Sequence, residues 1–419
     1  MIERLRNNNP DWKIYVAVAA AFALVMVFTD GNKYRIPAMV ILLLDLVLVG
    51  NQLSFDWGDL FLFLGMLIYK GIYEESFTDG LQYAFLILMV YQVGKYVALN
   101  KAGDIAVLIL AVAFFIPGCV NYSKWFSYKW SYEDGEWPYW TFRKYEEWET
   151  PIMSQTAHTL YIVLMGSLLI FWIMMIKKNK VLGIIGTLLS GITLVFGRLT
   201  MGKQAVCCSL FALFVSLIVY MIQNKLYKNI RLWHYILAIM DGLAVIGLLV
   251  ITNAGGFGTW FRHKIWSARD SLYYKDIFSV IAQSLGTPLR YPFGNDDVKF
   301  IQLDGDEIKD AKNSWLEIGR IGGLIPLVIT IAFTVVVVYC LVHIVRQREE
   351  QEKYAILSSF ASLSVFCFIT SAITDGQRWC VYIFICGLIS GQYAQLSNRT
   401  ELSIPLNRLF ERIGIIDKA

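Results

Sequence analysis

The sequence predicts an all-α, polytopic integral membrane protein with about twelve transmembrane helices and a large outer loop that carries an amphipathic helix. Of the 419 residues, 57% are hydrophobic and only 17% are charged, so there are too few polar side chains to cover several water-soluble cores. The mean hydropathy is +0.52. Twelve apolar stretches approach the roughly 20 residues that a helix needs to cross a bilayer core. A soluble enzyme is therefore excluded.

The whole chain, residues 1–419, is expected to form a single transmembrane domain. The first apolar run follows Arg4, Arg6 and Lys13 and has no clear small-residue cleavage site, which indicates an uncleaved first span. The predicted spans lie near residues 13–29, 36–52, 56–73, 81–98, 104–121, 157–176, 181–197, 204–222, 233–252, 322–345, 354–373 and 379–396.

The basic residues of the short loops predict the orientation. If the N-terminus is cytoplasmic, the inner loops and tails carry 17 Lys and Arg residues, whereas the short outer loops carry five. Because cytoplasmic loops are enriched in Lys and Arg, we expect both termini inside. The two long loops, 122–156 and 253–321, then lie on the outer face.

The charge distribution and the cysteine content argue against a nucleic-acid partner, a disulfide framework and a zinc site. The net charge of +4 is spread over many short loops and forms no block, so we expect no nucleic-acid partner. The seven cysteines lie in or at the edge of apolar stretches, their number is odd, and no CxxC occurs. Neither a disulfide framework nor a zinc site is indicated, and no bound metal or cofactor is expected.

The first outer loop is rich in tryptophan. Its five indole side chains are those of Trp125, Trp130, Trp137, Trp140 and Trp148. Such rings favour the headgroup region, so they are typical of an interfacial aromatic belt. They are equally suited to stack against the C–H faces of sugars, and their spacing does not separate the two interpretations.

The second outer loop contains a predicted basic amphipathic helix over residues 259–285, with its apolar positions at Phe261, Ile265, Leu272, Ile277, Ile281 and Leu285. Another face carries Arg262, Trp266, Arg269 and Tyr273. Anchorage at lipid headgroups is the alternative to a functional role. The following segment, 286–311, contains Pro288, Pro292 and Gly294 and an acidic run, which together predict an irregular, solvated stretch.

The predicted membrane orientation does not explain two cations in the short turn between the seventh and eighth spans. Arg198 and Lys203 lie on the predicted outer side, opposite to the charge bias of the neighbouring loops. A fixed pair of cations at the outer end of a helical bundle is suited to receive a phosphate or diphosphate. The alternative is that both side chains extend to lipid phosphates.

Three charged residues lie within predicted spans, namely Asp45, Lys70 and Lys95. Ionisable groups at membrane depth are typical of ion-coupled transporters. A buried structural ion pair or extension of the side chain toward the interface explains them as well.

Three motifs, in order along residues 180–345, carry a resemblance to a known family. The turn 199–203 (LTMGK) is similar to an "LTxSR" turn, residues 262–266 (RHKIW) to an arginine followed four residues later by tryptophan, and residues 312–323 (KNSWLEIGRIGG) to "HNxxLxxxxxxG". Together they resemble the O-antigen polymerase and O-antigen ligase superfamily of bacterial envelope enzymes.

The resemblance implies a metal-independent, inverting glycosyltransferase at the outer face of a bacterial inner membrane. Its donor would be a polyprenyl-diphosphate-linked oligosaccharide and its acceptor a glycan, with membrane lipids around it and a chain-length regulator or flippase as protein partner. It assigns the donor diphosphate to Lys203 and Arg262, with Arg198 and Arg269 beside them. Preorganised cations stabilise the negative charge that grows on the leaving group.

The chain departs from the family at Lys312, where ligases carry the histidine proposed as general base. This departure favours a polymerase over a ligase, and it leaves Lys312 either as a base or as a group that positions phosphate or acceptor. A flippase or transporter of lipid-linked oligosaccharides is the competing class. The remaining candidates are His263 and the acidic residues 304–310 as bases, and Trp266, Asn313, Asp375 and Arg378 around the donor pocket.

Overall fold

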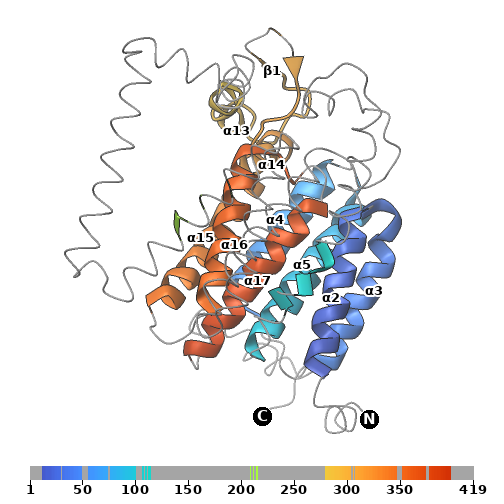
Figure 1. The fold of residues 1–419 in the computed structure, drawn as a ribbon. Coiled ribbons are helices and arrows are strands. Elements are labelled where there is room, and N and C mark those ends of the chain that lie inside the picture. The colour runs from blue at the N-terminus through green and yellow to red at the C-terminus, as the bar shows by residue number, and fades with distance from the viewer. Residues whose placement is uncertain are drawn as a thin grey trace, which may run out of the picture.

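The computed structural model describes residues 12–29, 31–49, 55–73, 76–100, 279–302, 305, 307–346, 352–373 and 377–397, with short pieces within 106–114 and 208–215. The described residues are mostly helical and form a bundle (Figure 1). The elements are α2 (Trp12–Thr29), α3 (Gly31–Val49), α4 (Trp57–Tyr73), α5 (Phe77–Leu99), α13 (Thr287–Arg290), β1 (Phe300–Ile301), β2 (Glu307–Ile308), α14 (Ser314–Gly322), α15 (Leu324–Arg346), α16 (Glu352–Ile369) and α17 (Gln377–Ser397).

Seven of these helices coincide with predicted spans, and the bounds differ most at α3. This helix begins at Gly31 because the polar residues before Pro37 continue the helix beyond the apolar stretch. Within the described part, α5, α15 and Trp379–Leu396 of α17 are long and apolar enough to cross a bilayer. These helices indicate a membrane protein. Twelve spans stay a prediction, because five of the predicted spans lie wholly or largely outside the described residues.

The centre of the bundle is the contact between α5 and α17, where glycines bring the two backbones together. A Cβ atom at Gly387 would collide with the carbonyl oxygen of Tyr91, and one at Gly391 with that of Lys95. Two small residues four positions apart on one helix face are typical of closely packed membrane helices. The Tyr91 hydroxyl also donates a 2.6 Å hydrogen bond to Ser390 Oγ across the contact.

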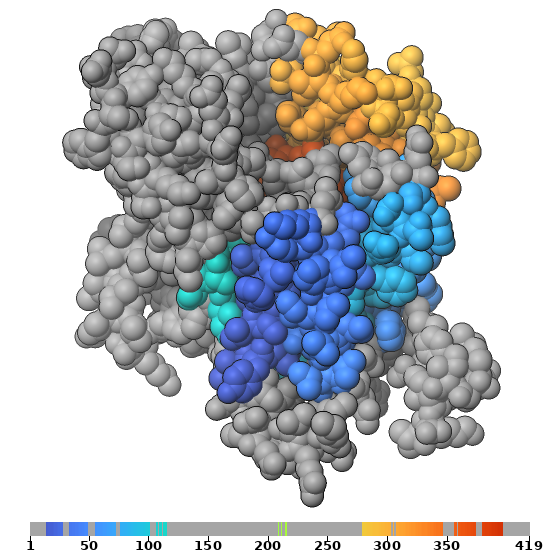
Figure 2. All heavy atoms as spheres, turned by 90° about the vertical axis from the view of Figure 1, so that its right-hand side faces the viewer, coloured from blue at the N-terminus to red at the C-terminus, as the bar shows by residue number. Residues whose placement is uncertain are grey.

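The other helices surround this pair. α4 packs on α5 and α15 on α4, while the α2–α3 hairpin lies against α5 and α17. Apolar side chains are exposed along the outer faces of the hairpin and of α15, including Phe22, Leu43, Leu44, Val47, Ile325, Val328 and Val335. Since lipid tails are as apolar as these side chains, such faces are suited to a bilayer. Figure 2 shows the α2–α3 face in blue, with the orange segment before α15 over one end of the bundle.

A buried charge cluster joins α4 to α5. The amide of Asp59 donates to Asp56 Oδ1 at 3.1 Å, and the amide of Asp56 donates to Asp59 Oδ2 at 2.7 Å, so the two carboxylates cap the start of α4 reciprocally. Lys95 Nζ lies 2.9 Å from Asp56 Oδ2 and 2.7 Å from Asp59 Oδ2. Gln92 Nε2 donates to Asp59 Oδ1 at 2.5 Å. The ammonium group and the N-terminus of α4 together balance the two carboxylates.

This cluster bears on the alternatives for Lys95, which is only 1% exposed. The structure shows a buried ion pair, and both carboxylates that contact the ammonium group also serve as helix caps, which favours a structural role. Lys70, also buried, lies over the ring of Tyr83, 5.6 Å from its centroid. Asp45 is buried on α3, and its Oδ2 accepts no hydrogen bond from the part of the chain that the structure describes.

The segment 286–311 is more regular than the sequence predicts. Thr287–Arg290 form the single turn α13, with Pro288 in its first turn, where a missing backbone N–H costs nothing. β1 and β2 then pair antiparallel, with Phe300 opposite Ile308. The prediction of a wholly irregular stretch is therefore wrong, because local pairing across Gly305 supplies backbone hydrogen bonds that composition does not reveal.

Only the last part of the predicted amphipathic helix 259–285 is described. Residues 279–284 are helical, and Ile281 is buried as its apolar position requires. Leu285, expected on the same apolar face, is 62% exposed, because the helix ends at residue 284 and the chain turns toward α13. For Leu285 the predicted helix face is wrong.

Candidate functional site

Asn313 and Lys312 lie where the loop before α14 enters the bundle. Asn313 caps this helix, since its Oδ1 accepts from the amides of Trp315 and Leu316 at 3.1 and 3.0 Å. Its Nδ2 donates to the carbonyl oxygen of Phe368, at the end of α16, at 3.0 Å. Both ends of the amide are used, so Asn313 fixes the turn in place rather than presenting a free group to a substrate.

The same turn is fastened to the end of α16 by two further contacts. Ser314 Oγ donates to the carbonyl oxygen of Thr370 at 2.8 Å. The hydroxyl of Ser371 donates to Asp310 Oδ1. Because these bonds connect residues far apart in sequence, the site at 310–314 depends on the packing of α14 against α16.

Lys312 has an unusual backbone and a bound counter-ion. Its φ of 54° is the one positive value among the non-glycine residues that the structure describes, a conformation that costs a side-chain-bearing residue of order 1 kcal/mol. Its amide donates to Asp310 Oδ1 at 2.8 Å, and its Nζ lies 3.1 Å from Asp310 Oδ2. The pairing of its Nζ with this carboxylate fits a positioning cation better than a general base.

A buried ion pair holds the loop to α14. Glu317 accepts from Arg320 Nη2 at 2.8 Å and Nε at 3.1 Å, and from the amide of Ala311 at 2.9 Å. Arg320 Nη1 donates to the carbonyl oxygen of Asp296 at 2.5 Å. Burial raises the pKa of Glu317, although the bonds from Arg320 oppose the shift. Arg320 and Glu317 thus connect α14 to two parts of the loop: Arg320 binds Asp296, and Glu317 binds Ala311.

Two glycines allow the loop to cross the end of α14. Gly294 and Gly323 have φ values of 83° and 84°, a region that favours glycine. A Cβ atom at Gly294 would collide with the carbonyl oxygen of Ile321. The crossing is closed by hydrogen bonds from the amide of Asn295 to Arg320 O at 2.7 Å and from the amide of Leu324 to Pro292 O at 2.8 Å.

Replacing Glu317 with alanine is expected to loosen this junction. Arg320 and the amide of Ala311 would lose their acceptor, at an expected cost of about 2–3 kcal/mol, since hydrogen bonds to charged groups are the stronger ones. Thermal unfolding and limited proteolysis of the purified protein measure this effect. Glu307→Ala, which removes an exposed pair with Lys299, is the control and should leave both readouts unchanged. Equal behaviour of the two variants would contradict the role of the buried pair.

Most of the predicted site residues lie outside the described residues, namely Arg198, Lys203, Arg262, His263, Trp266, Arg269 and Asp375. Arg378 lies within α17, but its side chain is not described. The structure therefore places Lys312 and Asn313 together and leaves the donor-binding cations as predictions. Among the acidic candidates, Asp310 binds Lys312 and Ser371, and its side chain is 40% exposed.

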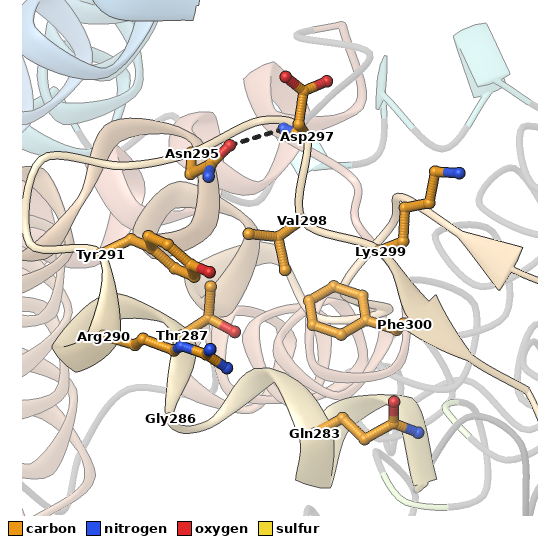
Figure 3. A pocket seen from close by; sticks show the side chains of 10 residues that line it. All are labelled: Gln283, Gly286, Thr287, Arg290, Tyr291, Asn295, Asp297, Val298, Lys299 and Phe300. Atoms are coloured by element: carbon orange, nitrogen blue, oxygen red, sulfur yellow. Dashed lines mark hydrogen bonds between the residues drawn. The ribbon is translucent and has the colours of Figure 1, made fainter.

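A polar pocket beside this junction was not predicted (Figure 3). It has a volume of about 470 Å³ and is lined by Gln283, Gly286, Thr287, Arg290, Tyr291, Asn295, Asp297, Val298, Lys299 and Phe300. These residues come from the end of the 279–284 helix, α13, the following turn and β1. The available signal was the mixture of aromatic, amide and basic residues among the prolines and glycines of 286–300, which the acidic run obscured.

A scan of protein-family models, a search of curated proteins and a search of solved structures each found no match to this chain.

Proposed function

We propose that the chain is a membrane glycosyltransferase that polymerises polyprenyl-diphosphate-linked oligosaccharide repeat units into a surface polysaccharide of the O-antigen or capsule type. The enzyme would lie in a bacterial inner membrane, with both termini cytoplasmic and its site on the outer face. The observation that carries this proposal is the 310–313 turn. There the family-like motif presents Lys312 in a strained conformation at the end of a bundle of apolar helices.

The proposed chemistry needs cations and a positioned acceptor, and no metal ion. An acceptor hydroxyl attacks the anomeric carbon of the donor, the bond to the diphosphate breaks, and the lipid diphosphate leaves with the electron pair. The hydroxyl proton passes to a base, for which His263 and the acidic residues 304–310 are the candidates. Lys203 and Arg262, assisted by Arg198 and Arg269, would hold the diphosphate and stabilise its growing charge. Lys312 would orient the acceptor or a phosphate oxygen.

Two alternatives are less well supported. A ligase that transfers glycan to a lipid or another acceptor would share the donor site, but Lys312 stands where ligases of the resembling family carry histidine. For a flippase or transporter of lipid-linked oligosaccharides, the buried charges would be the supporting feature. Lys95, Asp56 and Asp59 are bound to one another and to the start of α4, which favours a structural role for them.

The direct test is to incubate the purified protein in nanodiscs with a polyprenyl-diphosphate-linked oligosaccharide. We expect a ladder of products that differ by one repeat unit, with release of one polyprenyl diphosphate for each linkage formed. The reaction should proceed in the presence of a chelator. Movement of the donor across a vesicle membrane without any ladder would support the transporter class instead.

Substitutions at Lys312 separate positioning from proton transfer. We expect Lys312→Arg to retain activity within severalfold of the native enzyme, because a guanidinium supplies the same charge while staying protonated at physiological pH. The measurement is polymer yield against pH for the native enzyme and for Lys312→Arg and Lys312→His. An inactive arginine variant beside an active histidine variant would make Lys312 the base.

A further inference from the structure

The polar pocket of the outer loop has a fixed wall. Gln283 Nε2 donates to the carbonyl oxygen of Ile301 at 2.7 Å, and the amide of Ile301 donates back to Gln283 Oε1 at 3.0 Å. This pair of bonds connects the 279–284 helix to β1, on the side of the pocket where Phe300 lies. The opposite side is formed by α13, which packs on α14 through Pro288 and Gly319. Both walls of the pocket are therefore held by contacts within the chain.

Three hydrogen-bond donors on the α13 side are not used by the rest of the described chain. Figure 3 shows the hydroxyls of Tyr291 and Thr287 and the guanidinium of Arg290 gathered there and directed toward the hollow. Arg290 lies over the ring of Tyr291, 5.6 Å from its centroid, and forms no ion pair with any residue that the structure describes. Neither hydroxyl has a hydrogen-bond partner within those same residues.

Among the charged residues that line the pocket, Arg290 is the one whose charge is not balanced by another described residue. Lys299 Nζ lies 2.7 Å from Glu307 Oε2, and Asp297 Oδ1 lies 3.0 Å from Lys309 Nζ, so both of these lining charges have partners. A guanidinium is suited to bind two oxygens of a planar oxyanion at once, and nearby hydroxyls can donate to the same group. A ligand of this pocket is therefore expected to carry a negatively charged oxygen group.

The rest of the lining fits a sugar. The Oδ1 of Asn295 accepts from the amide of Asp297 at 2.9 Å, and its Nδ2 has no acceptor among the described residues. Such amide groups bind sugar hydroxyls. The rings of Tyr291 and Phe300 offer apolar faces for C–H groups. The volume of about 470 Å³ lies within the range of about 300–1,000 Å³ that small-molecule sites occupy.

We propose that this pocket binds an acidic sugar unit of a glycan, with Arg290 receiving its carboxylate or phosphate group. The inference rests on the proposed glycosyltransferase function, for which the pocket would hold the glycan chain beside the 310–313 turn. The class of ligand follows from the lining alone: a group of negative oxygens at Arg290, Thr287 and Tyr291, and a hydroxylated ring between Asn295 and Phe300.

The test is a direct binding measurement on the full-length protein in nanodiscs, so it does not depend on polymerisation. The probes are a disaccharide that contains glucuronic acid, the corresponding neutral glucose disaccharide, and inorganic phosphate, all followed by calorimetry. We expect the acidic disaccharide to bind, the neutral one to bind at least tenfold more weakly, and phosphate alone to compete only at much higher concentration.

Arg290→Gln is expected to weaken binding of the acidic disaccharide by about tenfold to a hundredfold, because a charged hydrogen-bonding partner is lost. Binding of the neutral disaccharide should be unchanged. Lys33→Gln removes an exposed cation elsewhere and is the matched control, with no expected change. Equal binding of the two disaccharides, or binding of phosphate without the acidic disaccharide, would overturn the inference. A product ladder beside absent disaccharide binding would reject the pocket and retain the proposed function.

Discussion

Replacing Lys95 with methionine is expected to lower the free energy of unfolding by about 3–5 kcal/mol, because the buried carboxylate of Asp59 and the partly buried one of Asp56 lose their cation. The ammonium group lies within 3 Å of both Asp56 and Asp59, and it is 1% exposed. Methionine has a similar length, so the loss of charge dominates over any loss of packing. Denaturant unfolding in detergent or in nanodiscs measures the change.

Two controls isolate the charge in this experiment. Lys299→Met removes a lysine whose ion pair with Glu307 is exposed, and it should leave the unfolding midpoint where it is. Adding Asp59→Asn to Lys95→Met should recover part of the loss, since one buried negative charge is removed with little change of shape. If Lys95→Met unfolds like the native protein, the cluster does not stabilise the bundle.

Lys203→Ala and Arg262→Ala are each expected to abolish or severely slow polymer formation while the protein still folds and inserts. Each change would remove a charged partner of the donor diphosphate, at about 1.5–3 kcal/mol or more, which corresponds to a rate loss of roughly tenfold to over a hundredfold. The measurement is the initial rate of ladder formation at saturating donor. Unfolding curves of the two variants should match that of the native protein.

Lys203→Arg is the informative companion variant. It should retain activity, because members of the family that the chain resembles carry arginine at the matching position of the turn. Lys178→Ala, in a predicted cytoplasmic loop, controls for a general loss of positive charge and should make normal polymer. Normal polymer from both Lys203→Ala and Arg262→Ala would show that the diphosphate binds elsewhere.

The sequence predicts the helices well because length and apolar content are local properties. α15 and α17 lie where uninterrupted apolar runs place them. It could not show that Lys95 pairs with two carboxylates whereas Lys70 lies over a tyrosine ring, since both are single lysines in apolar stretches. That difference arises only when α4 and α5 pack together.

The sequence likewise predicted one part of the candidate site and missed another. The motif at 312–313 indicated the entry to the bundle, and the structure places both residues there. The bond from Asn313 to Phe368 could not be read from the motif, because it joins residues 55 positions apart. The pocket around Arg290 was missed for the same reason, since its walls come from a helix end, a single helical turn and a strand.

The hydrogen bond from Tyr91 to Ser390 has a consequence for the time course of synthesis, because these residues are 299 positions apart. At about 5–20 residues per second, a ribosome completes α5 roughly 15–60 s before α17, whose glycines pack against it. Until then lipid or an insertion factor must occupy the face of α5 that α17 covers. Chains released before α17 is made keep the face open and lack the central contact, so they are expected to be substrates for membrane proteases.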